Sequence, residues 1–394
     1  MSLADPVVIA GYARTPMGGF MGDLSGLKAT ELGAAAVKAA VERADVDPAT
    51  IDRIFMGCVL PAALGQAPAR QAALGAGLPI SVRATTVNKM CGSGMEAAIM
   101  AYDALAAGTA DVIIAGGMES MSNAPYALPK HRAGARLGHG QIIDTMMMDG
   151  LEDAYTGKAM GAFAEDAVRD YQFTREDQDA YVIRSLSRAN AAIDSGAFER
   201  EIVSVSVPGR GGATTVNIDE QPGKAKPEKI PSLKPVFVKD GTITPANSSS
   251  ISDGAAALVM TRASIAEKLG MKVVARVVGH GGHAHEPGLF TTAPVPAIRN
   301  LMERIGWSMD DVDLFEVNEA FAVVAMIAAR DLGIPDEKLN VNGGACALGH
   351  PIGASGARIM ATLLAALENR GLKRGIASLC IGGGEATAVA LELV

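Results

Sequence analysis

The chain has 394 residues, 49% of them hydrophobic and 20% charged, so it is long enough to bury the core of two or three domains. Its formal net charge of −8 gives no general attraction to nucleic acid or to anionic lipid, and we expect neither as a partner. Glycine and alanine are abundant and suit helices packed closely on a sheet, so we expect an α/β fold. The sequence has no segment typical of a membrane span or a secretion signal, so we expect a cytoplasmic protein.

The same order of predicted strands and helices occurs twice along the chain. The corresponding pairs are 6–13 with 272–279, 51–59 with 312–318, 87–88 with 341–342, 94–107 with 354–369, 112–115 with 376–381, and 255–260 with 386–394. Residues 94–107 and 354–369 both have apolar residues at helical spacing. Residues 112–115 and 376–381 are both apolar strands that run into glycines. This pattern predicts a duplicated strand and helix unit.

The first copy is interrupted by a segment that is richer in proline, charge and methionine. Within it, Thr174 and Asp177 resemble a capping box that opens a helix near 175–193. We therefore expect three parts, which are residues 1–121 with 251–271, an inserted loop domain of residues 122–250, and residues 272–394. In folds with helices on both faces of a sheet, sites lie at strand ends and often between domains.

Cys91 stands where a predicted strand changes into a helix, directly before Gly92. A lone cysteine is usually a small buried hydrophobe, but the N–H groups at a helix start favour a thiolate. The neighbouring glycines allow a thioester to approach the backbone, and they leave N–H groups free for an oxyanion. The pattern indicates a nucleophile.

Three further polar residues lie at equivalent junctions of the second copy. His350 is in a glycine-rich turn and is a candidate base toward Cys91. Cys380 precedes three glycines and is a candidate second acid/base, although without the glycines it would be core. Asn318 could hold a water or donate to a carbonyl, while a turn or cap role is the commoner explanation.

Other sequence features favour simpler explanations. His280, His283 and His285 resemble metal ligands, but no cysteine or carboxylate lies near enough in sequence to complete a site, so we expect no metal. The four cysteines, widely scattered, are expected to be reduced thiols. No nucleotide-binding glycine motif or P-loop occurs.

Five motifs, in this order, resemble the thiolase family over nearly the whole chain. They are VNKMCGSG at 87–94, GGMESMS at 116–122, NEAF at 318–321, GHPIGASG at 349–356 and CIGGG at 380–384. The resemblance implies a duplicated, five-layered α/β fold with an inserted loop domain, assembled as a homodimer or homotetramer. It also implies an acyltransferase of fatty-acid metabolism.

The resemblance implies a role for each candidate. Cys91 would accept an acyl group from a coenzyme A thioester after activation by His350, with the carbonyl oxygen held by the N–H groups of Cys91 and Gly382. Cys380 would then remove a proton from acetyl-CoA in a Claisen condensation, and His350 and a water placed by Asn318 would meet the enolate. In reverse, the same residues would cleave a 3-oxoacyl-CoA. Coenzyme A is then a substrate, and no cofactor is expected.

The resemblance also places contacts to the substrate. Ser249 matches a serine that contacts coenzyme A, and Leu151, Met160, Ala320 and Phe321 fall where pantetheine or acyl contacts are expected. Ala159 stands where many short-chain members have histidine, and Phe290 lies near the acyl pocket where many have methionine. Lys224 or Lys226 could meet the phosphates of coenzyme A.

Two other functions share some of these features. A ketoacyl synthase has the same duplicated fold and a cysteine nucleophile, but Cys380 argues against it. A non-catalytic carrier of acyl-CoA or lipid would have lost catalytic residues, and here all four are present. The residues do not indicate the direction of the reaction or the preferred acyl length.

Overall fold

The computed structural model describes residues 4–394, in which ten strands form one continuous sheet. Apart from the short strand β2 (Gly18–Gly19), the strands follow the order β12-β13-β14-β11-β1-β10-β5-β3-β4. One half consists of β1 (Val7–Arg14), β3 (Arg53–Gly57), β4 (Arg83–Val87), β5 (Val112–Ser120) and β10 (Ser252–Arg262). The other half consists of β11 (Ala275–Ala284), β12 (Leu314–Val317), β13 (Arg374–Ile381) and β14 (Glu385–Leu393).

The strand directions confirm the duplication. From β1, the neighbours β10 and β5 are antiparallel in turn, and β3 then runs parallel to β5. From β11, the neighbours β14, β13 and β12 repeat the same directions. Within the sheet of residues 4–394, the pairing of β1 with β11 joins the two halves through two residue pairs, Val8 with Arg276 and Ile9 with Ala275. The counterpart of β4 is reduced to a bridge between Phe315 and Leu339.

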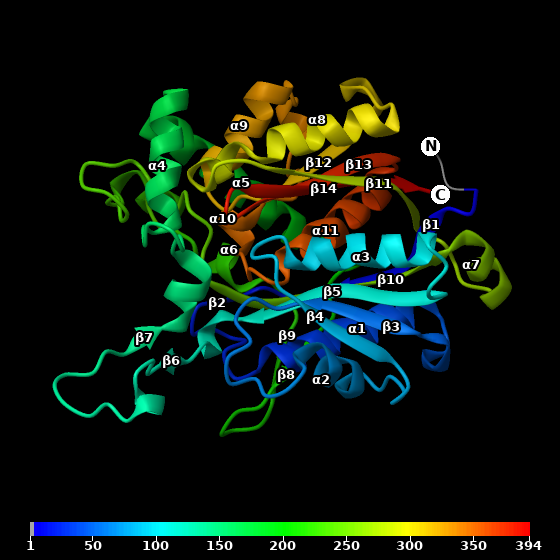
Figure 1. The fold of residues 1–394 in the computed structure, drawn as a ribbon. Helices are drawn as coiled ribbons and strands as arrows, with labels where there is room; N and C mark the ends of the chain where they lie inside the picture. The colour runs from blue at the N-terminus through cyan, green and yellow to red at the C-terminus, as the bar shows by residue number, and fades with distance from the viewer. Residues whose placement is uncertain (1–3) are drawn as a thin grey trace.

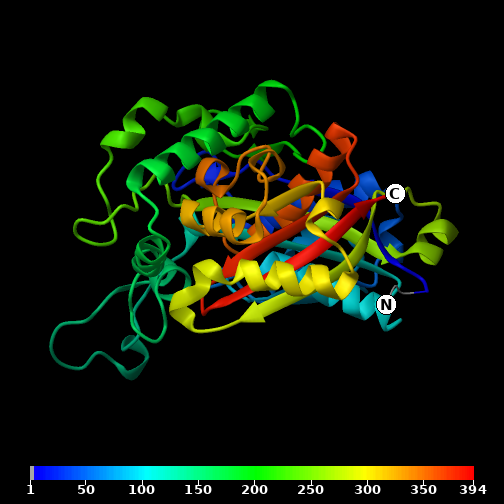
Figure 2. The same ribbon diagram turned by 90° about the horizontal axis from the view of Figure 1, so that it is seen from above.

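Helices cover both faces of each half, which gives the expected five layers (Figure 1). Below the first half lie α1 (Ala29–Ala44) and α2 (Pro68–Gly75), and above the second half lie α8 (Pro294–Ile305) and α9 (Ala322–Leu332). Figure 2 shows α8 lying across β13 and β14. Between the two halves, α3 (Ser93–Ala106) and α11 (Ser355–Arg370) pack together in one apolar core. The sequence thus predicts the layers correctly.

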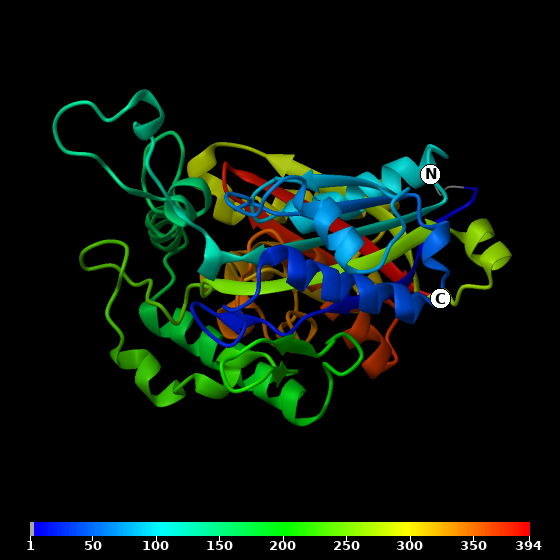
Figure 3. The same ribbon diagram turned by 90° about the horizontal axis from the view of Figure 1, so that it is seen from below.

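The inserted segment carries its own short elements. Thr174 and Asp177 form the capping box that opens α5, as expected. Its elements are β6 (Tyr126–Ala127), β7 (Ile143–Asp144), α4 (Met160–Tyr171), α5 (Arg175–Asp194), β8 (Val205–Val207), β9 (Thr214–Val216) and α6 (Glu220–Lys224). Figure 3 shows the segment between β6 and β7 extending away from the rest of the protein. The division into three domains stays a prediction.

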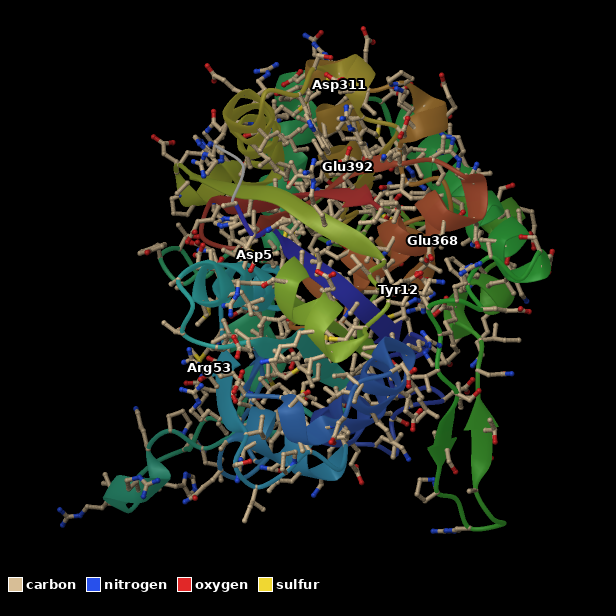
Figure 4. The ribbon with its side chains drawn as sticks, turned by 90° about the vertical axis from the view of Figure 1, so that its right-hand side faces the viewer. Asp5, Tyr12, Arg53, Asp311, Glu368 and Glu392 are labelled. Carbon is tan, nitrogen blue, oxygen red and sulfur yellow. The ribbon has the colours of Figure 1, made fainter. Side chains whose placement is uncertain are left out.

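Side-chain contacts also join the two halves at the end of the molecule that faces the viewer in Figure 4. The hydroxyl of Tyr12 on β1 donates to the carboxylate of Glu368 on α11. Within the second half, Glu392 on β14 accepts from Arg374 on β13 at 2.9 Å and pairs with Arg276 on β11 at 2.5 Å. Because the β1–β11 pairing is so short, we infer that the Tyr12–Glu368 contact helps to hold the layers together.

The close approach of α3 and α11 depends on glycine. A Cβ atom added at Gly356 would lie 2.3 Å from the backbone nitrogen of Met95. Gly356→Ala is therefore expected to lower the free energy of unfolding by about 1–3 kcal/mol, although alanine favours a helix. Gly223→Ala in α6 meets open space and serves as the control. Urea unfolding followed by circular dichroism measures both, and equal stability of the two variants would contradict the packing argument.

Candidate active site

Side-chain hydrogen bonds fix the turn that presents Cys91. Asn88 Oδ1 accepts the N–H of Met90 at 3.0 Å, and Ser93 Oγ accepts the N–H of Lys89 at 2.8 Å. Ser93 also donates to the carbonyl of Met90 at 2.6 Å. Met90 has a φ of 46°, a left-handed conformation that costs energy in a residue other than glycine and often occurs at functional sites. The turn thereby holds Cys91 in the wall of a cavity.

The Cys91 thiol is protonated at neutral pH. Burial raises its pKa to about 11, although the N–H groups of Gly382 and of Cys91 itself favour the thiolate. The backbone N–H groups thus favour the thiolate in the expected direction, but α3 begins only at Ser93 and loss of solvent has the larger effect. The same two N–H groups lie where they can meet a developing negative charge.

His350 reaches the same cavity with a defined tautomer. Its Nδ1 atom lies 2.6 Å from Ser355 Oγ, and that hydroxyl donates to the carbonyl of Pro351 at 2.9 Å. The hydroxyl must then accept from Nδ1–H, which leaves a lone pair on Nε2. Nε2 is buried and has no hydrogen-bond partner among residues 4–394. Burial and the charge of Arg358 lower the pKa of His350 to about 3, so the ring is neutral.

Cys380 is the penultimate residue of β13, which ends at Ile381 before a turn of three glycines. Gly383 and Gly384 have φ values of 98° and 86°, which favour glycine. Burial raises the pKa of the Cys380 thiol well above its usual value, and negative charge on Cys91 raises it further. The two thiols therefore interact. Lys89 and Glu385 form a 2.5 Å ion pair between the two turns that carry these cysteines.

The cavity between these turns has a volume of about 370 Å³ and is largely apolar. It is lined by Cys91, His350, Cys380 and Gly382, and all six predicted substrate contacts also line it, namely Leu151, Met160, Ser249, Phe290, Ala320 and Phe321. The amide of Ser249 donates to the carbonyl of Ala320 at 2.9 Å, which joins the inserted segment to the second half. The structure thus brings together predicted residues that are far apart in sequence.

Asn318 is the exception, because it lies behind the cavity wall. It follows β12 and is almost fully buried, and it is not one of the lining residues. Its Oδ1 atom accepts from Arg358 Nη2 at 3.4 Å. Its Nδ2 atom has no partner within the described chain. A polar amide group is therefore available next to the site.

Glu119 is a site-supporting residue to which sequence reasoning gave no role. Its carboxylate accepts N–H groups from Val59, Leu60 and Gly353 at 2.9, 3.1 and 2.9 Å, respectively. Burial raises its pKa to about 7, and these three donors oppose the shift. Glu119 thereby links β5 of the first half to the loop before α11. Its signal in the sequence is a glutamate near the end of an apolar, glycine-containing strand.

The structure also adds lining residues that the sequence reasoning missed. Met147 and Gly150 come from a single turn of π-helix, Met147–Leu151, a conformation frequent at functional sites. Phe237 lies edge-on to Phe321 with ring centroids 5.8 Å apart, and its ring fills the space that a side chain at Gly161 would need. An apolar Val236–Phe237 pair within a polar loop is the signal that could have indicated it.

Other candidate residues lie elsewhere. Lys224 pairs with Glu220. Lys224 and Lys226 both line another cavity, of about 490 Å³, and Pro245 lines both this cavity and the candidate site.

His280 lies 3.1 Å from Asp103, away from the candidate site. Across residues 4–394, no group of three or more histidine, cysteine, aspartate or glutamate side chains could hold a metal ion. In the same range, no helix combines the length and apolarity that crossing a membrane requires.

Comparison with known proteins agrees with this geometry. The family model for the thiolase N-terminal domain matches residues 7–264, and the model for the thiolase C-terminal domain matches residues 271–393. The chain belongs to the thiolase family. Among curated thiolase relatives, acetyl-CoA acetyltransferase 2 of Arabidopsis thaliana is 52% identical over 98% of this chain and 97% of its own length. The acetyl-CoA acetyltransferase of Pseudomonas aeruginosa is 45% identical over 98% of both chains.

Solved thiolase structures share the whole fold. The crystal structure of the Bacillus anthracis acetyl-CoA acetyltransferase has a TM-score of 0.97 and 40% identity over 100% of both chains. Acat5 thiolase from Ascaris suum, solved in complex with coenzyme A, has a TM-score of 0.94 and 40% identity. That match covers 99% of this chain and 100% of the Ascaris chain. The thiolase fold expected from the five motifs is confirmed.

Proposed function

We propose that this thiolase catalyses the reversible condensation of two acetyl-CoA molecules to acetoacetyl-CoA and coenzyme A. The observation that carries the proposal is that two thiols, Cys91 and Cys380, line one apolar cavity together with an unpartnered Nε2 atom of His350. Acyl transfer needs a soft nucleophile and carbon deprotonation needs a base, so two different thiols suit the two halves of this reaction.

In the first half-reaction, Cys91 Sγ attacks the thioester carbonyl carbon while its proton passes to His350 Nε2. The N–H groups of Cys91 and Gly382 receive the oxyanion. Because thiol and imidazole are both neutral at rest, we expect the proton to move as the carbon–sulfur bond forms. The departing coenzyme A sulfur takes the proton of Cys380, which leaves an acetylated Cys91, a protonated His350 and a Cys380 thiolate.

In the second half-reaction, the Cys380 thiolate removes a proton from the methyl carbon of another acetyl-CoA. Its raised pKa makes it a strong base for a weak carbon acid. His350 and a water held by Asn318 stabilise the enolate oxygen, and the enolate carbon attacks the acetyl group on Cys91. Cys91 leaves and regains a proton from His350. Coenzyme A is a substrate throughout, and the steps need no separate cofactor or metal.

The lining favours a small acyl group. Phe290 and Phe237 both pack edge-on against Phe321, with centroids 6.1 and 5.8 Å apart, so aromatic rings occupy one wall of the cavity. The relatives named above are acetyl-CoA acetyltransferases, which agrees with a short substrate. A series of 3-oxoacyl-CoA substrates of increasing length tests this, with kcat/KM expected to be highest for acetoacetyl-CoA. A maximum at a longer chain would favour a degradative 3-ketoacyl-CoA thiolase.

The proposed activity is tested by mixing the purified protein with acetoacetyl-CoA and coenzyme A. We expect the absorbance of acetoacetyl-CoA to decay only when coenzyme A is present, and peptide mass spectrometry to find the acetyl group on Cys91. A ketoacyl synthase or a non-catalytic carrier would show no such decay. Absence of the decay would therefore reject the thiolase reaction.

We also propose a homotetramer whose chains associate through the arm, defined as residues 126–144. Three large apolar side chains of the arm, Tyr126, Leu137 and Ile142, are exposed to 68%, 99% and 65%. Such residues on a projecting segment suit burial between chains. Leu137→Asp is expected to lower the mass measured by sedimentation, whereas Leu137→Met keeps it. An unchanged mass for Leu137→Asp would argue against association through the arm.

We propose the cytoplasm as the compartment because Cys91 must remain a reduced thiol.

A further inference from the structure

Arg358 is a charged residue buried at the centre of the molecule that the reaction steps above do not use. It lies on α11 between the two halves, and none of its surface is exposed. Its Nη2 atom donates to Asn318 Oδ1 at 3.4 Å, and its Nη1 atom lies 3.8 Å from Glu316 Oε2. Burying a guanidinium group is costly, so its position calls for a role beyond packing.

The contact with Asn318 determines which way the amide points. Arginine has only donors, so the amide must turn its oxygen toward Arg358 and its Nδ2–H₂ group away. Nδ2 is buried without a partner in the described part of the chain, and so is His350 Nε2. Asn318 Nδ2 and His350 Nε2 are thus two buried nitrogen atoms without a partner among the described residues, and the enolate proposed above would form beside His350. Without Arg358, the amide could rotate and present an acceptor to a negatively charged oxygen.

Glu316 neutralises this arginine only weakly. Burial raises the pKa of Glu316 to about 8, although Arg358 opposes the shift, so the carboxyl group is largely protonated at pH 7. One of its oxygens, Oε1, has no partner among residues 4–394. Other charged groups that influence Arg358 include Arg14, Glu201 and Glu319. Burial lowers the pKa of His350 and keeps the ring neutral in the resting site, and the charge of Arg358 makes a smaller contribution in the same direction.

We propose that Arg358 is a positioning residue for the second half-reaction, because its guanidinium group holds the Asn318 amide with an N–H group toward the enolate oxygen. This inference rests on the function proposed above. It separates Arg358 from the acyl-transfer step, in which the oxyanion meets the N–H groups of Cys91 and Gly382. Loss of Arg358 should therefore slow proton removal from acetyl-CoA more than acetylation of Cys91.

The two half-reactions can be measured separately on the full-length protein. Mass spectrometry follows acetylation of Cys91 by acetyl-CoA, and incorporation of solvent deuterium into the methyl group of acetyl-CoA follows proton removal. Arg358→Gln is combined with Glu316→Gln so that Glu316, the acidic side chain next to Arg358, is not left as a buried carboxyl group without its partner. We expect deuterium incorporation to fall roughly 100-fold, as for a misplaced catalytic group, and acetylation to change less than about 3-fold. Glu316→Gln alone is the matched control, with both rates close to wild type.

A double-mutant cycle with Asn318→Ala distinguishes positioning from a structural role. If Arg358 acts through Asn318, removing it from the Asn318→Ala protein should cause no further loss of deuterium incorporation. Equal and additive losses, or a parallel fall in acetylation, would overturn the inference. If the combined variant does not fold, Arg358→Lys provides the same cycle, with an expected loss of about 10-fold that disappears in the Asn318→Ala protein. Absence of both half-reactions in the wild type would instead reject the proposed function.

Discussion

Cys91→Ala is expected to lower kcat for thiolysis of acetoacetyl-CoA by at least about 10⁴-fold, because no other group can form the acyl intermediate. Neither Cys58 nor Cys346 lines the cavity, and the only nearby thiol, Cys380, has the role of base. The N–H groups that stabilise the oxyanion remain in the variant, so a small residual rate above the uncatalysed reaction is expected. The absorbance decay of acetoacetyl-CoA measures the loss.

Cys346→Ala is the matched control for this variant. Cys346 is also a cysteine close to a turn of the second half, but its thiol donates to the carbonyl of Glu319 at 3.6 Å and lies outside the cavity. We expect its kcat to stay within about 3-fold of wild type, as for a substitution away from the reacting atoms. If Cys91→Ala retained wild-type activity, the assignment of the nucleophile would be wrong.

Cys380→Ala is expected to separate the two half-reactions. Acetylation of Cys91 by acetyl-CoA should continue at a reduced rate, since the nucleophile, His350 and both oxyanion donors are intact and only the proton donor to the departing coenzyme A sulfur is lost. Condensation should fall by about 10²–10⁴-fold, the usual contribution of a general base. Quantifying acetylated Cys91 by mass spectrometry, beside the rate of acetoacetyl-CoA formation, measures both effects in one sample.

The control for Cys380→Ala is Cys380→Ser, which keeps a hydrogen-bonding group of similar size. A hydroxyl has a much higher pKa than a thiol, so the serine does not readily form the anion that would act as the base. We therefore expect Cys380→Ser to accumulate acetyl-enzyme as well. Equal loss of acetylation and condensation in both variants would show that Cys380 supports the site as a whole, and the division of labour between the thiols would be wrong.

Much of the fold was predictable because duplication doubles each signal. Every strand of the first half except β4 has a regular counterpart in the second, and the capping box at Thr174 marks the start of α5. The predicted nucleophile, base and second thiol meet in one cavity because strand ends of both halves converge there. Local patterns were sufficient for these residues, since glycines on either side of a reactive side chain are a strong signal.

The sequence could not predict features that arise from tertiary packing. The protonated state of Cys91 depends on how much solvent the folded chain removes, which no local motif encodes. Phe237 and Met147 enter the cavity from irregular segments of the insert, where no periodicity guides prediction. The orientation of the Asn318 amide follows from its contact with Arg358, a residue 40 positions later in the chain.

The division of the reactive groups between the two halves has a consequence for how the protein is made. During translation, β1 to β10 and the turn of Cys91 leave the ribosome before His350 and Cys380 have been synthesised. The thiol at position 91 then has neither its proton acceptor nor the Gly382 amide beside it. We therefore expect a nascent chain to carry an inert cysteine that becomes reactive only when the second half folds against the first, so incomplete chains should not consume acyl donors.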